Sequence, residues 1–414
     1  MKAVLTLPSF RRLVLAYALN EFAWSVGNFA LSLLVYRRTG NALASTGFFL
    51  TSQFLPAFIT PSVVAWADRF DPRRVLAVLY ALQACLFLTL AAAPSHFYLA
   101  PILALVLVGG SLGLAARPIL RATTARLVTP GGFLRDSNAV INVAFGFSIL
   151  LGPIIGSALV LASGTTLAVL VDAAIFGTIS LALAAAHGLS ATLPERRGPR
   201  LRVRAALEQA NRHVAVRRIL TFQAVAWTIF SMTLPLEVVL AQHVLHAGAA
   251  GYGALLSAWG SGAIVGSALY ARWRALPGWL LIAFGSSAIG VGFLLMAVAP
   301  SIVLAVVGAV IGGVGNGIEP VAERTALQEQ VEDGWMTLTL SLNESIFQAF
   351  PGPGFLLGGL LATLTGARLA FLVAGVGAVS VALLAPLLLR TPSVVSGTDE
   401  AGDDRSAQRR EVIS

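Results

Sequence analysis

Long apolar runs, interrupted by charged residues or by Gly, Pro, Ser and Asn, repeat along the whole chain. A helix that crosses a hydrocarbon core of about 30 Å needs roughly 20 mostly apolar residues. Runs such as 97–116 and 280–299 lack the alternation that a membrane β-barrel strand shows. The pattern predicts an all-α membrane protein with twelve transmembrane helices, at residues 12–36, 42–66, 74–94, 98–120, 138–163, 166–187, 217–242, 250–272, 277–298, 301–322, 336–364 and 367–390.

The composition supports this prediction. Of the 414 residues, 57% are hydrophobic and 11% charged, and the mean hydropathy is +0.82. Soluble chains carry about 25% charged residues, so a cytosolic enzyme is excluded. The net charge of +9 comes from arginines separated by apolar runs, which indicates contact with anionic lipid rather than nucleic acid. The single cysteine, Cys85, can form neither an intramolecular disulfide nor a metal cluster, and we expect no metal and no cofactor.

Basic residues collect at alternate connections between the predicted helices. With the N-terminus inside, only Arg37, Arg38 and Arg368 fall in outer connections, and Arg117 falls within a helix. Cytoplasmic loops carry such an excess of basic residues, so both termini are expected in the cytoplasm. Lys2 is the only lysine, which is typical of a GC-rich bacterial genome. We therefore expect a multi-pass protein of the bacterial plasma (inner) membrane.

The longest polar connection, residues 188–216, is basic and divides the predicted helices six and six. Its part from Arg204 onward fits either an amphipathic helix on the lipid surface or a solvated linker. Residues 391–414 are polar and mixed in charge, so a disordered cytoplasmic tail is expected. The predicted domains are two six-helix bundles, 1–187 and 217–390.

The two halves share an internal repeat. VGGSLGLAARPILRATTARLV, from Val108, matches IGGVGNGIEPVAERTALQEQV, from Ile311, in a glycine pair, a charged residue before proline and a following Arg and Thr. At a similar offset, Gly156 corresponds to Gly358. Gene duplication accounts for a register that is held across two helices. It predicts two bundles related by a pseudo-two-fold axis along the membrane normal, with a binding cavity between them.

Six plus six helices with a long basic central loop resemble the major facilitator superfamily, and more specifically its bacterial drug- and siderophore-exporting branch. The superfamily's loop after the second helix is matched by WADRFDPRRV, although Val64 stands where the family has glycine. The exporters' motif Gly-Pro-x-x-Gly-Gly is matched by Gly152, Pro153 and Gly156, with serine in the last place. For these three residues, helix packing and an exporter-specific function are equally open. The resemblance spans about residues 10–390.

The resemblance implies that the loop after the second helix helps to close the inner mouth of the cavity. Charged residues at helix ends can form contacts that exist in only one conformation. We expect such gating contacts from Asp68, Arg69, Arg73 and Arg74. The alternative is a solvated loop whose arginines serve only to orient the chain in the membrane.

Six ionisable residues fall inside predicted spans, where a charge at mid-bilayer costs about 2.5–3.5 kcal/mol. The family's third, sixth, ninth and twelfth helices lie outside the cavity, which leaves one of the six, Asp172, to packing or helix capping. Glu21 lies about 14 Å into the first helix at 1.5 Å per residue and is the first candidate for a proton carrier; a structural hydrogen bond is the alternative. Glu237 and Glu344 are further proton-coupling candidates, for which a location at an exposed helix end is the alternative. The full set is Glu21, Arg117, Asp172, Glu237, Glu319 and Glu344.

Arg117 and Glu319 occupy equivalent positions in the repeat, each directly before a proline. We predict that these opposite charges pair across the pseudo-axis when the inner mouth is shut and separate when it opens. Arg121, Glu323 and Arg324 would extend this gate one turn further out. The alternative is that each residue pairs within its own half.

Aromatic and amide side chains on the cavity-lining helices are candidates for cargo contacts. Aromatic rings suit amphipathic or cationic ligands, although most aromatics of a membrane protein contact lipid. The predicted cavity residues are Phe22, Trp24, Asn28, Phe54, Asn142, Trp227, Phe230, Asn316 and Asn343.

Together these features predict a secondary active transporter that exports a small amphipathic compound, a drug or siderophore, by proton-coupled alternating access. No Gly-rich phosphate loop ending in Lys-Ser or Lys-Thr indicates ATP hydrolysis, and no HExxH or GxSxG motif indicates an enzyme. We expect a monomer whose partners are cargo, protons and membrane lipids. An importer of the same fold and a non-transporting membrane sensor or scaffold are the alternatives.

Overall fold

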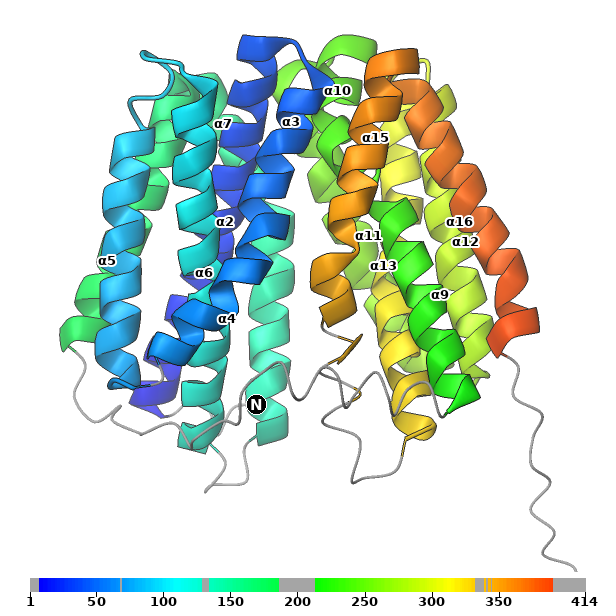
Figure 1. The fold of residues 1–414 in the computed structure, drawn as a ribbon, viewed down its shortest axis with the longest axis horizontal. Coiled ribbons are helices and arrows are strands. Elements are labelled where there is room, and N and C mark those ends of the chain that lie inside the picture. Colours follow the sequence, from blue (N-terminus) through cyan, green and yellow to red (C-terminus); the bar gives the residue numbers. More distant parts are fainter. Residues whose placement is uncertain are drawn as a thin grey trace, which may run out of the picture.

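The computed structural model describes residues 7–67, 69–128, 134–185, 213–331, 339, 342–343 and 345–389, and the regular elements in these ranges are all helices. The first half contains α2 (Pro8–Thr39), α3 (Ala42–Phe49), the π-helical η1 (Leu50–Phe54), α4 (Leu55–Ala67), α5 (Pro72–Leu90), α6 (Leu99–Val128) and α7 (Leu134–Ala185). These elements form one bundle, here called the N-bundle (Figure 1).

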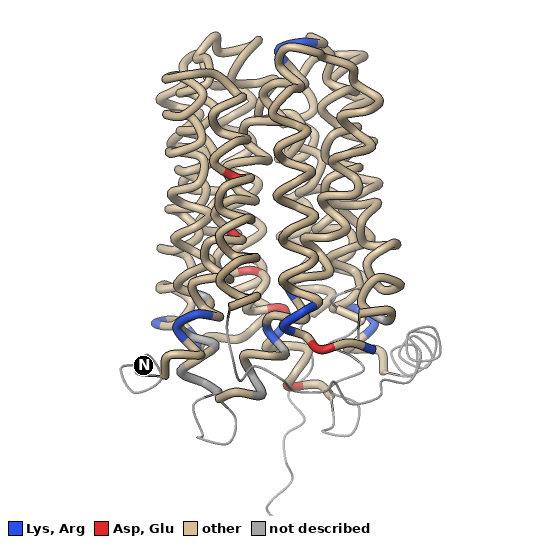
Figure 2. Tube along the Cα trace, turned by 90° about the vertical axis from the view of Figure 1, so that its left-hand side faces the viewer, with Lys and Arg blue, Asp and Glu red and all other residues tan. Residues whose placement is uncertain are grey.

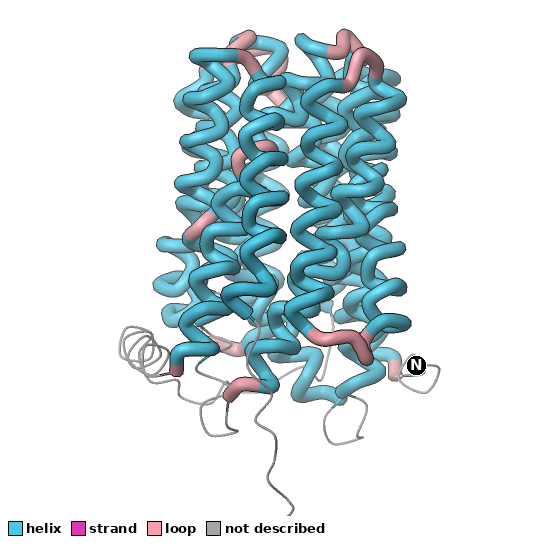
Figure 3. Tube along the Cα trace, turned by 90° about the vertical axis from the view of Figure 1, so that its right-hand side faces the viewer, coloured by secondary structure: helices cyan, strands magenta, loops and turns pink. Residues whose placement is uncertain are grey.

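The second half forms a second bundle beside the first, here called the C-bundle, in which short loops join α11 to α12, α12 to α13 and α15 to α16 (Figure 3). It begins with α9 (Val214–Ser231), which continues through three short elements, η3 (Leu234–Leu236), α10 (Glu237–Val239) and η4 (Leu240–Val244). It is completed by α11 (Gly248–Trp273), α12 (Gly278–Val298), α13 (Ile302–Glu329), α15 (Pro351–Thr365) and α16 (Ala367–Leu389).

Twelve membrane crossings result, as the apolar runs predict. Ten segments of the described ranges are long and apolar enough to span a membrane. One of them, within α7, crosses twice, because Ser163 and Gly164 have non-helical backbone angles and Gly164 has a φ of 78°. The remaining crossing is α2, whose 32 residues suffice in length but whose hydropathy is lowered by Asn20, Glu21 and Asn28. The break in α7 falls where the sequence separates helices 138–163 and 166–187.

The limits of the predicted domains stay a prediction. Most of the linker 188–216 and the whole tail 391–414 lie outside the described residues. The described part of each bundle, 8–185 and 214–389, agrees with the division of the apolar runs into six and six.

The two ends of the molecule differ in their content of arginine. The described N-terminus and the connections that follow α4 and α11 lie at one end, which we call the arginine-rich end, with Arg11, Arg69 and Arg272. Arg37 and Arg38 lie at the opposite end, in the last turn of α2 (Figure 2). This separation is the one that the sequence predicts, while the side of the membrane that each end faces stays a prediction.

Glycines let the helices of the C-bundle approach backbone to backbone. A Cβ added at Gly262 or Gly266 of α11 would overlap a carbonyl oxygen of α13, from Val310 or Val314, and one at Gly317 would overlap the carbonyl oxygen of Ala263. Small residues at such interfaces are the usual means by which transmembrane helices associate closely, because lipid provides no hydrophobic driving force. The glycines therefore make α11 and α13 a closely fitted pair.

The two bundles touch along α7 and α11. A Cβ at Gly253 would lie 2.7 Å from Cβ of Ser157 and 3.0 Å from the carbonyl oxygen of Pro153, and one at Gly260 would lie 3.1 Å from Cγ2 of Ile149. Further contacts lie toward the opposite end, where α3 packs on α15 and Thr46 closely approaches Gly359.

At that opposite end an aromatic stack and two side-chain hydrogen bonds join the bundles. The rings of Phe29 and Tyr252 stack with centroids 4.9 Å apart, and the hydroxyl groups of Tyr252 and Ser32 are hydrogen-bonded at 3.1 Å. Arg37 donates across the gap to Gln242 at 3.1 Å. The ribbons of the two bundles diverge toward the arginine-rich end (Figure 1).

Two glycine-to-alanine substitutions test the packing of α11 on α13. Gly266→Ala forces a Cβ against the Val314 carbonyl, so we expect the overpacking penalty of about 1–3 kcal/mol to exceed the gain in helix propensity, about 1 kcal/mol, and to lower the unfolding temperature. Gly177→Ala, whose Cβ would have its nearest neighbour 4.0 Å away, is the matched control and is expected to keep or raise that temperature. Thermal unfolding of the detergent-purified variants measures both; equal stability would contradict the close packing.

Candidate functional site

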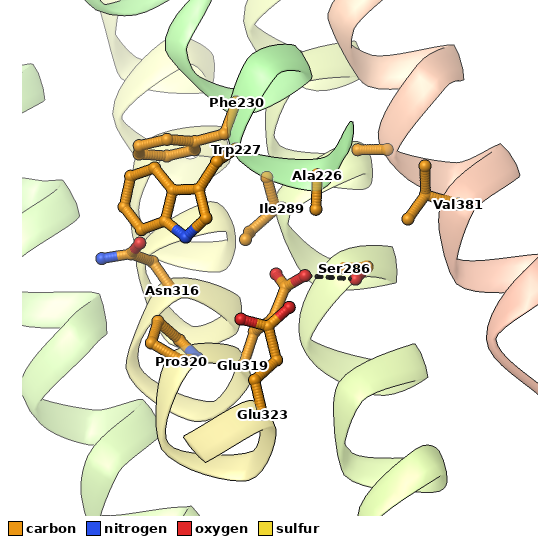
Figure 4. Close-up of a pocket in the computed structure, with 11 residues that line it drawn as sticks. Ala226, Trp227, Phe230, Ser286, Ile289, Asn316, Glu319, Pro320, Glu323 and Val381 are labelled. Atoms are coloured by element: carbon orange, nitrogen blue, oxygen red, sulfur yellow. Dashed lines mark hydrogen bonds between the residues drawn. The ribbon is translucent and has the colours of Figure 1, made fainter. Parts of the chain in front are cut away.

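A pocket in the C-bundle gathers several of the residues that the sequence predicts for cargo contacts. It is formed by α9, α12, α13 and α16 and encloses about 400 Å³ of empty space, including the part open to solvent. Trp227, Phe230 and Asn316, all predicted cavity residues, line it (Figure 4). Ligand pockets of proteins commonly combine apolar walls with a few polar groups.

Aromatic rings make up one wall of this pocket. The ring of Trp227 lies edge-on to Phe230 at 5.1 Å between centroids and 4.5 Å from the ring of Phe347. Phe230 also lies 5.6 Å from Trp259. Such contacts hold the rings in place, so the wall presents a fixed aromatic surface on which a planar or cationic molecule can stack.

Two acidic side chains face the pocket from one side of α13. Glu319 is 6% exposed and accepts a hydrogen bond of 2.6 Å from Oγ of Ser286 on α12. Glu323 follows one helical turn later, is 1% exposed, and neither of its oxygens has a hydrogen-bond partner among the described residues (Figure 4). None of the residues that line the pocket is basic. The pocket therefore contains two buried carboxyl groups and no compensating side chain of its own.

The sequence marks Glu319 and Glu323 as gating residues, but it does not identify Ser286 or the shared pocket. The spacing i, i+4, which puts both acids on one helix face, was the available signal. Ser286 lies in the apolar stretch AFGSSAIG, where serine is a common small packing residue and gives no separate indication.

Glu21 forms an ion pair inside the N-bundle. Its Oε2 lies 2.7 Å from a guanidinium nitrogen of Arg117 on α6, and Asn20 donates to its other oxygen at 3.1 Å. The guanidinium group also lies over the ring of Trp24, 4.9 Å from its centroid. Arg121, one turn further along α6, donates to the hydroxyl of Tyr17 at 2.8 Å. In this conformation, therefore, Arg117 pairs within its own half, and so does Glu319 through Ser286.

Glu237 lies at a break in the seventh crossing rather than at an exposed helix end. The α-helix stops at Ser231, and the chain continues as the short helices η3, α10 and η4. Glu237 is buried there, and its Oε2 has no hydrogen-bond partner among the described residues. Val238, its neighbour in the chain, belongs to the same apolar cluster as Phe29 and Leu33, and α10 contacts α2. Glu237 thus belongs to the contact between the bundles at the opposite end.

The other predicted cavity residues lie in different places. Trp24 and Asn28 line a second pocket, which lies inside the N-bundle. Phe54 lies against Gly352 between the bundles, Phe22 packs on an apolar cluster to which both bundles contribute, and Asn343 is buried. Asp68, Glu344 and the side chain of Asn142 lie outside the described residues.

The arginines after the second crossing have different environments. Arg73 donates from Nε to the carbonyl oxygen of Leu183 at 3.0 Å and also donates to Ala184, which ties α5 to the end of α7. Asp71 caps α5 by accepting from the backbone N–H of Arg73. Arg69, Arg74 and Arg324 are exposed.

The Gly-Pro motif of the fifth crossing lies in close packing on both of its sides. Gly152 closely approaches Ser25 on α2, and a Cβ at Gly156 would lie 3.1 Å from Cδ1 of Phe29. The carbonyl oxygen of Pro153 faces Gly253 of α11. The motif thus joins α2 and α11 through the first part of α7.

Comparison with known proteins agrees with this architecture. The family model of the Major Facilitator Superfamily matches residues 13–353 and 219–413. No curated protein matches the chain. Among solved structures, the nucleoside transporter NupG is similar, with a TM-score of 0.76 and 12% identity over 93% of this chain and 100% of that one.

Two further solved structures share the fold. The POT family transporter PepTSo has a TM-score of 0.72 and 10% identity over 92% of this chain and 97% of that one. The human organic anion transporter MFSD10 (TETRAN) has a TM-score of 0.62 and 20% identity over 93% of this chain and 100% of that one. At these identities the likeness concerns the fold alone. Because the family model covers most of the twelve crossings, the chain belongs to the major facilitator superfamily.

Proposed function

We propose that this chain is a proton-coupled exporter of small amphipathic compounds, such as drugs or siderophores, that works by alternating access of one binding site to the two sides of the membrane. The observation that carries the proposal is the C-bundle pocket, in which a fixed aromatic wall faces two buried carboxyl groups without a basic neighbour. Aromatic surface and negative charge together suit cargo that is apolar, planar and cationic.

The arginine-rich end faces the cytoplasm in this proposal, and the chain is a monomer in the bacterial inner membrane with both termini in the cytoplasm. The positive-inside rule supports this orientation. The closed end then faces outward. Cargo would enter the pocket from the cytoplasm in the present conformation, as export requires.

Protons are exchanged for cargo at Glu319 and Glu323. Two ionised carboxylates one turn apart in hydrocarbon would repel each other and lack solvation, so the pair keeps a proton or binds a cation. Arrival of a cationic compound provides the compensating charge and releases the proton. Glu21, Glu237 and Glu344 remain proton-coupling candidates, with Glu21 held by Arg117 in this conformation.

Gating at the arginine-rich end involves Arg117, Arg121, Arg324 and the loop with Asp68, Arg69, Arg73 and Arg74. When the bundles close there, the proposal brings Arg117 and Arg121 toward Glu319 and Glu323 across the pseudo-axis. Arg117 then exchanges its present partner, Glu21, for an acid of the other half. The same movement frees Glu21 to bind a proton.

Sensitivity profiling tests the proposal directly. A bacterial strain with and without this gene is exposed to drugs and siderophores, and ethidium efflux is followed by fluorescence. We expect the chain to confer resistance and pH-gradient-dependent ethidium efflux. Glu319→Gln and Glu323→Gln should each reduce efflux about tenfold, which corresponds to about 1.4 kcal/mol of lost stabilisation.

The matched control is Glu329→Gln, because Glu329 is exposed at the end of α13. It is expected to export as the unmodified chain does. Ethidium uptake into right-side-out vesicles, without uptake into inverted ones, would establish an importer. Unchanged efflux in both pocket variants would contradict the assigned proton and cargo site.

Charge exchanges distinguish the two partners of Arg117. Glu21→Arg and Arg117→Glu alone should each lower thermal stability and transport, whereas the double exchange should restore stability, with a coupling of about 0.5–3 kcal/mol that is usual for residues in contact. Exchange of Arg117 and Glu319 should instead recover part of the transport lost by Arg117→Glu or Glu319→Arg alone, up to the reduced level of Glu319→Gln, without restoring stability in the present conformation. Failure of the second double variant to recover any transport would count against pairing across the axis.

A further inference from the structure

Asp172, in the second part of α7, is a carboxyl group that the proposed transport cycle leaves unexplained. It is 0% exposed, and neither of its oxygens has a hydrogen-bond partner among the described residues. Packing or helix capping, the expectation from sequence, provides no partner for an acid in this position. The residue lies well inside its helix, far from either end of the second part of α7.

A glycine on the neighbouring helix makes room for this carboxyl group. A Cβ added at Gly27 of α2 would lie 2.6 Å from Oδ2 of Asp172 and 2.8 Å from Cε1 of Phe87 on α5. Any larger residue at position 27 would therefore collide with the acid or the ring. The carboxyl group lies directly against the backbone of α2, beside an aromatic ring.

The same glycine and the same ring line the second pocket, inside the N-bundle between α2, α5 and α6. Asn28, Ser52 and Gln83 bring polar groups to this pocket. Gln83 is 1% exposed, and its Nε2 has no hydrogen-bond partner among the described residues. A pocket with a free buried donor is a place where water can bind. Gly27, which lies against Asp172, also lines this pocket.

No described contact supplies Asp172 with a positive charge. On α2, the acid nearest to Gly27 along the helix is Glu21, six residues or about 9 Å from that glycine. Glu21 is paired with Arg117 of α6. On α5, the buried hydroxyl of Tyr80 has no hydrogen-bond partner among the described residues, and Tyr17 of α2 is bound by Arg121. An ionised carboxylate here would be both unpaired and unsolvated, which is prohibitively costly.

A proton fits this site better than a metal ion. Cations such as Ca²⁺ or Mg²⁺ require six or more oxygen ligands, whereas neither oxygen of Asp172 has a polar partner at hydrogen-bond distance among the described residues. The described ranges also contain no group of three or more His, Cys, Asp or Glu side chains that could hold a metal.

We propose that Asp172 is a proton-binding site of the N-bundle, which holds its proton in the present conformation and exchanges it with water in the pocket lined by Asn28 and Gln83 when the bundles rearrange. The proton binds to a carboxylate oxygen and leaves as hydronium, with no other reaction partner. The role of this site in coupling rests on the proposed function, whereas its protonation does not. The chain then has separate proton sites in its two bundles.

Infrared spectroscopy of the purified chain in lipid nanodiscs tests the site without any cargo. At pH 7 the spectrum of the unmodified chain minus that of Asp172→Asn should contain the C=O stretch of one protonated carboxyl group, and transfer to D₂O should shift it. Asparagine has the same shape and no charge, so the variant is expected to fold. Absence of the band would show an ionised Asp172, and a band that never shifts in D₂O would show a proton sealed from water; either result overturns the proposal.

Ethidium transport driven by a pH gradient in proteoliposomes tests coupling. We expect Asp172→Asn to bind ethidium as the unmodified chain does and to continue downhill ethidium exchange. Its accumulation of ethidium against the ethidium concentration gradient should fall about tenfold or more. Glu329→Gln is again the control. Full accumulation by Asp172→Asn would overturn a coupling role. If the unmodified chain itself shows no proton-driven ethidium movement, the proposed function fails, and the infrared result still decides the site.

Discussion

The cost of an unpaired charge in hydrocarbon governs the arrangement of this protein. A charge at the centre of a bilayer that has neither water nor a partner is expensive, so each ionisable side chain in a span needs a specific reason to be there. Glu21 and Arg117 meet this demand by pairing with each other. Glu319 meets it in part through Ser286, while Glu323 and Asp172 have no hydrogen-bond partner among the described residues. The groups that remain without partners are therefore the ones whose protonation or ligand must complete the structure.

Small residues provide the second constraint. Glycines on α11 bring its backbone against α13, and the glycines of the fifth crossing bring α7 against α2. Closely fitted helices resist internal rearrangement, because a change in one must displace the backbone of the other. Movement is then directed to the surfaces between the bundles, where α7 and α11 touch through Gly253 and Gly260.

The sequence predicts the crossings well because length and apolarity are properties of single segments. The break at Ser163 and Gly164, for example, lies at the gap between two predicted helices. Partners between helices are harder to predict. The internal repeat fixes how deep Arg117 and Glu319 lie, but not the rotation and tilt that bring Arg117 to Glu21. Around Glu237 the α-helix gives way to short 3₁₀ and π segments. The hydrophobic pattern does not predict this change, because a continuous apolar run is compatible with all three kinds of helix.

The aromatic and hydroxyl contacts between the bundles at the end opposite the arginine-rich end have a consequence for the response to ionic strength. Stacking of Phe29 on Tyr252 and the hydroxyl contact with Ser32 involve no net charge, so dissolved salt leaves their strength almost unchanged. Charged groups at the arginine-rich end are screened over about 10 Å at 0.1 M salt. In the proposed cycle, added electrolyte thus weakens the charged contacts that close the arginine-rich end more than the aromatic stack at the other end, and so shifts the balance between the two conformations.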